Sequence, residues 1–534
     1  MAYQGHSVPI HLGALGLRTD DPMTALPPNA LIKANNVSFH SGRIEKDAGS
    51  SKLNATALPT GVVAVTDWWP TPSLQRTIAV CSSGKVYRDT GAGTFNSNTA
   101  IRDFAATLTP DVHMCVGGQE AATNNKKLFI FTGSAQIHRI TGDGAATAAI
   151  STPNVDWAAS GYPTFGLMYQ QKMCAFGSGN NRHTIYFSLS GDHEDYNTTP
   201  LTFPIFPGEG DGIVAGFVHL GLLFLFKKPF GVYVFDGRDP LSANWTVSKY
   251  SDSFGIQSPH AVIAALSDLI IANSFGSYTS LQSSQRFGSF EAGDILANNH
   301  LDDYIRGLFN RAGFSLTQSV YYAEKKKILF SAQSSSADTR DRMIVMDMSR
   351  EQLRISIDTK EQPNCLALKR DGNGILKPMY GDKNGFVWLM DQASYNRAGL
   401  PYLGEFQTAY TDFSFADPAL SGKNKIFEFL DVQYVSTGTN SFYCDVYVDG
   451  KFRHTLTFNQ RYGVNLGTFL LGTDSLAGTP VSARNRKRML SCTGNKISFR
   501  FYNGNSGEAF KIERIVCEFR PSGEEVYSAQ TTSG

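Results

Sequence analysis

The stretches Gly166–Phe176 (GLMYQQKMCAF) and Gly216–Phe226 (GFVHLGLLFLF) show the same pattern of residue types, about 50 positions apart. In each, a glycine begins an apolar run, a short turn follows, and a second apolar run ends in phenylalanine. Two extended runs joined by a tight turn predict a β-hairpin. A hairpin that recurs at a regular spacing indicates a repeat architecture.

The second run of this hairpin recurs along roughly the first 400 residues, in steps of about 45–60. The corresponding runs are Thr77–Val80, Leu128–Phe131, Met173–Phe176, Leu222–Phe226, Leu269–Ile271, Ile328–Phe330 and a weaker one at Lys377–Tyr380. A turn and a further extended segment follow each run. Three or four strands in every unit of about 50 residues predict a β-propeller, here with six or seven blades over residues 61–400. An irregular set of β-hairpins is the alternative.

The two ends of the chain lack this rhythm. Residues 1–60 are rich in Leu, Asn, Gly and Pro, and only Asn36–His40 and Arg43–Lys46 predict a hairpin. An apolar arm without its own core is expected to pack on the propeller, closing its first blade, or on a neighbouring subunit. Alternating runs in residues 401–534 predict a C-terminal β-sandwich. The clearest helix candidate is His300–Phe309.

Composition agrees with an all-β chain. Of 534 residues, 50 are glycine, 12% are aromatic and only 18% are charged, as expected for many tight turns. A net charge of +1 argues against a strong basic field for nucleic acid, although DNA passing through a channel stays compatible with it. The seven cysteines form no CxxC pair, so buried free thiols are expected. Neither a signal peptide nor a membrane-spanning segment is predicted.

The sequence contains no familiar catalytic motif, and no catalytic, cofactor-binding or metal-binding residue is predicted. Asp192–Asp195 (DHED) is interpreted as a turn, because adjacent side chains of an extended segment point in opposite directions. Asp382–Trp388 approaches the turn motif of sialidase propellers but departs from it at Tyr380 and Asn384. The densest basic run comprises Arg484, Arg486, Lys487 and Arg488. It predicts a solvated loop, with a partner or phosphate contact as the functional alternative.

The N-terminal segment resembles a known family. Its pieces are LGLRT (15–19), PPNALI (27–32), ANNV (34–37), SGRIEK (41–46) and Gly49. Their order and spacing resemble the opening of the tail nozzle, hub or stabilisation proteins of short-tailed bacteriophages. The residues that the resemblance suggests as assembly contacts are Leu15, Leu17, Arg18, Leu31, Asn35 and Arg43.

This resemblance implies a non-enzymatic virion protein without cofactors, synthesised in the host cytoplasm. Such a protein would form a homo-oligomeric ring, most simply a hexamer, below the adaptor proteins of the tail. The ring would extend and gate the DNA-ejection channel and dock tail fibres or spikes. Viral DNA would pass through it without sequence-specific binding.

Two other functions remain open from the sequence. One is a propeller that binds or cleaves glycans, which would need convergent carboxylates in its central funnel. The other is a monomeric protein–protein scaffold. Removal of residues 1–50 is expected to leave the propeller folded.

Overall fold

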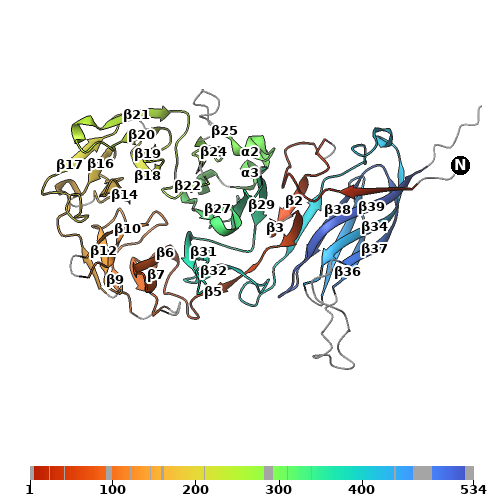
Figure 1. The fold of residues 1–534 in the computed structure, drawn as a ribbon, viewed down its shortest axis with the longest axis horizontal. Helices are drawn as coiled ribbons and strands as arrows, with labels where there is room; N and C mark the ends of the chain where they lie inside the picture. Colours follow the sequence, from red (N-terminus) through yellow and green to blue (C-terminus); the bar gives the residue numbers. More distant parts are fainter. Residues whose placement is uncertain are drawn as a thin grey trace, which may run out of the picture.

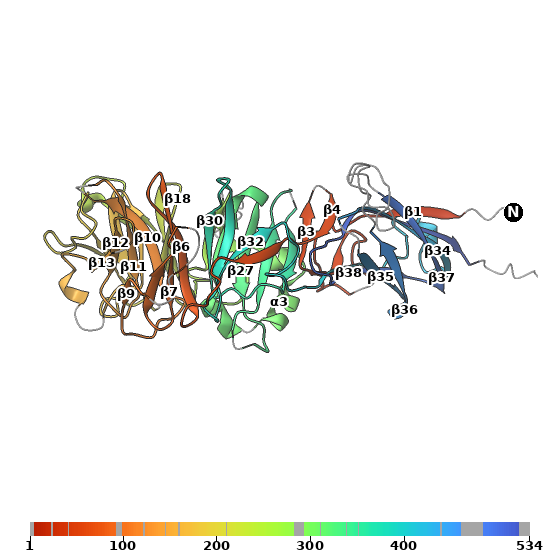
Figure 2. The same ribbon diagram turned by 90° about the horizontal axis from the view of Figure 1, so that it is seen from below.

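The computed structural model describes residues 5–22, 25–40, 42–91, 95, 99–120, 123–144, 146–157, 161–209, 211–266, 268–281, 293–309, 311–337, 339–350, 352–437, 440–460 and 484–522. The fold is all-β and propeller-like. Figure 1 shows small sheets arranged in a ring at one end of an elongated molecule, and long C-terminal strands at the other. The view from below in Figure 2 shows the same two parts side by side.

Four-stranded antiparallel sheets follow one another around the ring. Sheet 1 contains β6 (Val62–Thr71), β7 (Leu74–Cys81), β8 (Lys85–Arg88) and β9 (Arg102–Asp103). Sheet 2 contains β10 (His113–Gln119), β11 (Lys126–Phe131), β12 (His138–Thr141) and β13 (Ala146–Ala149). Sheet 3 contains β14 (Phe165–Tyr169), β15 (Lys172–Phe176), β16 (Thr184–Phe187) and β17 (Leu201–Pro204). Sheet 4 contains β18 (Ile213–His219), β19 (Leu222–Lys227), β20 (Val232–Asp236) and β21 (Thr246–Ser251).

The remaining sheets of the ring use the same order. Sheet 5 contains β22 (Val262–Ala265), β23 (Asp268–Ala272), β24 (Tyr278–Ser280) and β25 (Gly293–Asp294). Sheet 6 contains β26 (Ser319–Tyr322), β27 (Lys327–Ala332), β28 (Arg342–Asp347) and β29 (Arg354–Asp358). Sheet 7 contains β30 (Cys365–Arg370), β31 (Leu376–Gly381), β32 (Val387–Gln392) and the N-terminal strand β5 (Gly49–Lys52). Each apolar run identified in the sequence lies in the second strand of its sheet, which confirms the repeat and the all-β fold.

The packing of each sheet against the next explains why the two repeated stretches begin with glycine and end with phenylalanine. A Cβ atom on Gly166 of β14 would lie 2.1 Å from the ring of Phe131 in β11. One sheet further on, a Cβ atom on Gly216 of β18 would lie 2.7 Å from the ring of Phe176 in β15. The phenylalanine that ends one second strand therefore packs on the bare backbone of the next inner strand, and close packing leaves no room for a side chain there.

The N-terminal arm packs on its own chain, the first of the two alternatives that the sequence left open. Strand β5 pairs with β32, with Trp388 opposite Lys52 and Leu389 opposite Ser51, so it completes sheet 7 rather than the first sheet. Strand β2 (Leu31–Asn35) lies between β29 of sheet 6 and β33 (Gly404–Thr408). The arm thus links the ring to the C-terminal part.

The C-terminal part consists of two sheets. One joins β3 (Val37–His40), β4 (Arg43–Lys46), β39 (Lys511–Pro521), β34 (Lys425–Val435) and β37 (Arg484–Gly494), with β1 (His6–Ile10) also paired to β39. The other continues sheet 6 through β2 and β33 to β38 (Ile497–Asn503), β35 (Ser441–Val448) and β36 (Lys451–Asn459). This second sheet has nine strands in all and crosses the boundary between the two parts. One hydrophobic core runs from sheet 3 through the arm to both C-terminal sheets.

Helices are short in the described residues. They are α2 (Ile295–Asn298), α3 (Asp302–Leu308) and the 3-10 turns Val155–Trp157, Ser242–Asn244, Arg311–Leu316, Ala323–Lys325 and Pro418–Leu420. The predicted helix at His300–Phe309 is confirmed by α3. The arm contacts this helix too, because the carboxylate of Asp20 accepts hydrogen bonds from the backbone amides of Asp303 (2.9 Å) and Tyr304 (3.0 Å).

Candidate functional site

Two of the six predicted contact residues in the arm are buried inside the chain itself. Leu17 is 1% exposed and Leu31 is fully buried, both in the main core. The backbone amide of Leu17 donates to the carbonyl of Ile355 in β29 at 3.0 Å. Their side chains therefore contribute to packing within the subunit.

The other four predicted contact residues are partly buried. Asn35 donates from Nδ2 to Glu405 of β33 at 3.0 Å, and Arg43 lies 3.8 Å from Glu513 of β39. The backbone amide of Arg18 donates to the carbonyl of Leu31 at 2.9 Å, and that of Leu15 to the carbonyl of Asn29 at 3.3 Å. The segment that carries the family resemblance is thus the segment that joins the two parts of the molecule.

The basic run at 484–488 does not form the loop that the sequence predicted. These residues begin strand β37, which pairs antiparallel with β34. Lys487 forms an ion pair with Glu518 of β39, and Arg488 donates from Nε to the carbonyl of Thr457 at 3.1 Å. The loop prediction was wrong because alternating charged side chains also suit an exposed strand at the edge of a sheet.

The acidic segment Asp192–Asp195 divides between two roles. Asp195 accepts hydrogen bonds from the backbone amides of Asn197 and Thr198, both at 2.9 Å, as its turn interpretation requires. Glu194, however, is buried and pairs with Lys127 at 2.6 Å and with Arg139. Within the described residues, no group of His, Cys, Asp and Glu is arranged to hold a metal ion.

The sialidase-like segment serves as a structural turn. Asp382 accepts hydrogen bonds at Oδ1 from the amides of Asn384 (2.9 Å) and Phe386 (2.8 Å). Its Oδ2 accepts a hydrogen bond from the indole of Trp388 at 2.8 Å. The carboxylate is nearly buried and holds the hairpin between β31 and β32, so it is occupied by its own turn.

Sequence reasoning missed Asn36, which connects the arm to both parts. Its Nδ2 donates to Thr359 Oγ1 (2.8 Å) and to the carbonyl of Leu403 (2.7 Å). Its Oδ1 accepts from the amides of Thr359 (2.7 Å) and Lys360 (3.2 Å). The residue has φ +53°, a conformation that asparagine adopts more readily than most side chains. The paired asparagines of the ANNV motif were the available signal.

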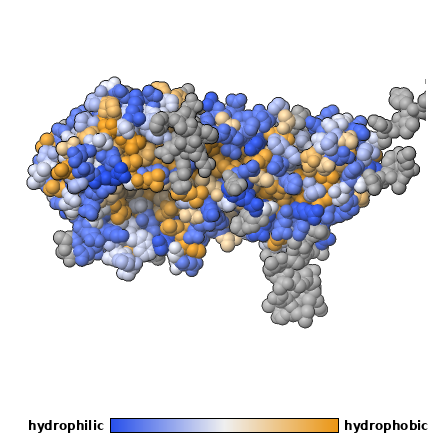
Figure 3. Space-filling view, turned by 45° about the horizontal axis from the view of Figure 1, so that its top comes forward, coloured by the Kyte–Doolittle hydropathy of each residue, from blue (hydrophilic) through white to orange (hydrophobic). Residues whose placement is uncertain are grey.

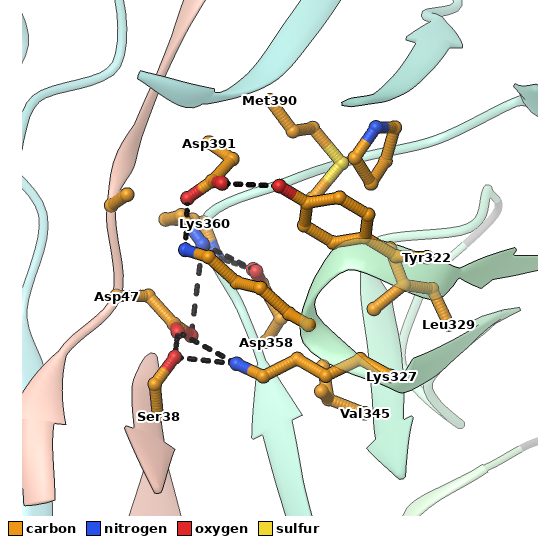
Figure 4. A pocket seen from close by; sticks show the side chains of 13 residues that line it. Ser38, Asp47, Tyr322, Lys327, Leu329, Val345, Asp358, Lys360, Met390 and Asp391 are labelled. Carbon is orange, nitrogen blue, oxygen red and sulfur yellow. Dashed lines mark hydrogen bonds and ion pairs between the residues drawn. The ribbon is translucent and has the colours of Figure 1, made fainter. Parts of the chain in front are cut away.

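A largely buried charged cluster, which we call the junction, lies where the arm meets sheets 6 and 7 (Figure 4); of its members, Lys325 is exposed. Equal numbers of basic and acidic side chains form it: Lys325, Lys327, Lys360 and Arg397, and Asp47, Asp358, Glu361 and Asp391. Lys360 occupies its centre. It lies 2.5 Å from Asp358, 3.9 Å from Asp47 and 3.9 Å from Glu361.

Hydrogen bonds complete the junction. Lys327 donates to Ser38 Oγ at 2.6 Å, and Ser38 donates to Asp47. Tyr322 donates to Asp391 at 2.6 Å, and Lys325 lies 2.5 Å from the same carboxylate. Each charge in this network therefore faces an opposite charge.

The electrostatics of the junction follow from this pairing. Burial alone would raise the pKa of Asp47, but Lys360 and Lys327 hold it below its ordinary value. Burial would lower the pKa of Lys360, and its three carboxylate neighbours raise it instead. The lysine and Asp47 are both charged at neutral pH. The cavity among these side chains has a volume of about 40 Å³, enough for a few water molecules but not for a substrate.

Lys46 extends this network to the C-terminal part. It is fully buried, and its Nζ donates to the carbonyls of Asn505 (2.8 Å) and Glu508 (3.2 Å) beside β39. Burial lowers its pKa to about 8, with Lys360 acting in the same direction. The junction and Lys46 together fix the arm to three sheets.

A second pocket, which we call the funnel, opens among the segments that enter sheets 2 to 5. Its volume is about 300 Å³. The lining residues are Asp111, Thr164, Gly177, Arg182, Asp211, Gly212, Ile213, Val214, Lys228, Gln257 and Pro259. Two carboxylates thus face one cavity, the feature that the glycan alternative requires.

Three aromatic rings meet beside the funnel, at the centre of the ring of sheets. His113 at the start of β10 stacks on Phe165 of β14, with ring centroids 3.7 Å apart. His260, before β22, lies 5.4 Å from His113, and its Nε2 is 3.2 Å from the carbonyl of Val112. Sheets 2 and 5 are not neighbours, so these side chains close the centre. Burial lowers the pKa of both imidazoles, to about 4 for His260, so both are neutral at neutral pH.

Comparisons with known proteins give no family. No protein-family model matches the chain, and no curated protein matches it in sequence. Similar solved structures include the computationally designed Ika8 protein, with a TM-score of 0.36 and 12% identity over 67% of this chain and 96% of that one. YCF48 from Cyanidioschyzon merolae has a TM-score of 0.40 and 11% identity over 64% and 99%. BBS1N in complex with ARL6DN has a TM-score of 0.41 and 9% identity over 66% and 98%.

No helix in the described residues has the length and apolar character needed to cross a bilayer. All seven cysteines are free thiols, and five of them are buried.

Proposed function

We propose that the chain is a non-enzymatic structural subunit of the tail of a short-tailed bacteriophage. In this proposal it forms a ring, most simply of six copies, that extends and gates the DNA-ejection channel and docks neighbouring tail proteins or fibres. The seven sheets are the blades of a seven-bladed β-propeller, and the two C-terminal sheets form a β-sandwich. The protein is made in the host cytoplasm and ends in the virion.

The observation that carries the proposal is the position of strand β2. It belongs to the N-terminal segment with the family resemblance, and it lies inside a nine-stranded sheet that spans both parts of the molecule. A continuous sheet together with the junction connects the two parts of the subunit through many contacts. A ring that encloses a channel needs subunits of fixed shape, so this construction supports the proposal.

Exposed apolar side chains offer surface for contacts between subunits. Leu220, Leu241 and Leu266 are 78%, 65% and 62% exposed, and they lie in the connections between strands of sheets 4 and 5. Figure 3 shows that hydrophobic residues reach the surface across one face of the ring of sheets, among hydrophilic ones. Grouped exposed apolar residues are typical of interaction surfaces. The near-neutral net charge suits a conduit through which DNA slides.

Native mass spectrometry and cryo-electron microscopy of the purified chain test the proposal. We expect a closed ring with an axial opening, and loss of the ring when Leu220, Leu241 and Leu266 are replaced together by serine. A triple variant at the exposed residues Ser73, Ser151 and Ser253, changed to alanine, serves as the control. A chain that remains monomeric at high concentration, both alone and with the tail proteins encoded beside it, contradicts the proposal.

A further inference from the structure

Three exposed charged side chains of the funnel lack the partners that the charges of the junction have. In the part of the chain that the structure describes, the side chains of Arg182, Asp211 and Lys228 form no ion pair or hydrogen bond with one another or with other residues. Asp111 accepts one hydrogen bond, from Thr109 Oγ1 at 3.3 Å. Charges left without partners in a shared cavity are available to a ligand.

The signs of these charges restrict the ligand. Asp111 and Asp211 are hydrogen-bond acceptors when ionised, whereas Arg182 and Lys228 are donors only. A simple anion would be repelled by the two carboxylates, and a simple cation by the two basic groups. A hydroxyl group donates one hydrogen bond and accepts others, so a ligand with several hydroxyls satisfies both kinds of partner at once.

Size and surroundings favour the same ligand class. A volume of about 300 Å³ is at the small end of ligand pockets, which suits one or two sugar units. Thr164 and Gln257 add uncharged polar groups to the lining. Ile213, Val214 and Pro259 add apolar surface to the same lining. A polar ligand with an apolar face, as sugars have, matches this combination.

We propose that the funnel is a binding site for a carbohydrate unit, held by Asp111, Arg182, Asp211 and Lys228. The site goes beyond the structural role, because it would serve a tail subunit and a free-standing propeller equally. Binding places a sugar at the entrance to the ring of sheets, next to the aromatic rings that close its centre. No bond is made or broken in this proposal.

Saturation-transfer NMR and calorimetry of the full chain test the site. The probes are glucose, galactose, mannose, rhamnose, N-acetylglucosamine and glucuronic acid, each at millimolar concentration, with alanine and inorganic phosphate as non-sugar competitors. We expect at least one sugar to bind and neither competitor to displace it. Asp211→Asn and Lys228→Ala should each weaken binding by about tenfold or more, the usual effect of losing a hydrogen bond to a charged group.

Matched variants make the result decisive. Asp303→Asn changes an exposed aspartate of α3 outside the funnel and should leave binding unchanged. Circular dichroism should show that all variants are folded, since the changed side chains are exposed. The proposal is overturned by three results: no sugar in the panel binds, sugar binding persists in the Asp211→Asn/Lys228→Ala double variant, or alanine or phosphate competes for the site. None of these results bears on ring formation.

Discussion

The junction and the funnel both gather charged side chains from several sheets, but they use them differently. In the junction each charge faces an opposite one, around a cavity of about 40 Å³. In the funnel, acids and bases share a cavity of about 300 Å³. The side chains of its Arg182, Asp211 and Lys228 have no partner among the described residues. Paired charges hold the chain together, whereas unpaired charges in an open cavity are free to bind. Net charge alone does not separate the two cases, because both clusters are balanced.

Removing the arm that carries part of the junction should have the largest effect. Deletion of residues 1–52 removes β5 from sheet 7 and β2 from the nine-stranded sheet, and exposes the edges of both. We expect a chain that aggregates or is rapidly degraded in limited proteolysis, since unpaired sheet edges and an opened core are exposed. Deletion of residues 1–10, which removes only β1 at the edge of β39, should be far milder. A folded, protease-resistant 53–534 fragment would mean that the arm is an accessory, as the sequence suggested.

Removing the central lysine of the junction should destabilise the chain less than deletion of the arm, but should still lower the free energy of unfolding substantially. Lys360→Met leaves Asp47, Asp358 and Glu361 buried without their central base. The free energy of unfolding should fall by about 3–5 kcal/mol, as measured by urea denaturation. Lys423→Met, at an exposed lysine, should change it by less than about 0.5 kcal/mol. Equal effects of the two variants would mean that the ion pairs of the junction contribute little.

The aromatic rings beside the funnel predict a pH dependence. Burial lowers the pKa of His260 from 6.5 to about 4 in the folded chain. Between these two pH values, the imidazole is protonated in the unfolded chain and neutral in the folded one. Stability should therefore decrease as the pH falls from 6.5 towards 4, by up to about 3 kcal/mol from this residue. The positive charge of Arg340 also lowers the pKa of His260. Burial lowers the pKa of the adjacent His113 as well, so this residue adds to the loss of stability at low pH.

The pH dependence is measured by thermal unfolding at a series of pH values. His260→Gln should flatten the decrease between pH 6.5 and 4, while His11→Gln, at an exposed histidine, should leave the slope unchanged. A slope that is identical in wild type and His260→Gln would show that this imidazole is accessible to protons in the folded chain.

The smallest effect is expected in the funnel. Asp211→Asn removes a charge that has no side-chain partner among the described residues, so the free energy of unfolding should change by less than about 0.5 kcal/mol. Differential scanning calorimetry beside the Lys360→Met variant gives the comparison directly. A large destabilisation by Asp211→Asn would place this carboxylate in a structural network like that of the junction.

Much of the ring of sheets was predictable from the sequence, because its strands are marked by short apolar runs of neighbouring residues. Runs such as Leu128–Phe131 and Leu222–Phe226 are long enough and apolar enough to identify buried strands. The contact between Phe131 and Gly166 was not predictable, because it joins different sheets. Strand β5 (GSSK) has no apolar periodicity, so its pairing with β32 depends on tertiary structure alone.

The junction was missed for a related reason. Lys327 and Lys360 are buried, and lysine is rarely buried without partners that only the folded chain assembles. Lys360 has two carboxylates close to it in the sequence, Asp358 and Glu361, but the partners that the two lysines share with the arm, Ser38 and Asp47, lie about 300 residues away. The funnel has the same limitation, because Asp111 and Asp211 become neighbours of one cavity only when sheets 2 and 4 are in place.

The pairing of β5 with β32 also determines when sheet 7 can form during synthesis of the chain. Residues 49–52 leave the ribosome early, but their partner strand at 387–392 is made about 340 residues later, some tens of seconds at ordinary translation rates. Until β32 has been made, β5 lacks the strand with which it pairs in the folded protein. The ring therefore closes only when most of the chain exists, and a prematurely terminated product carries an open edge that quality control in the cell can recognise.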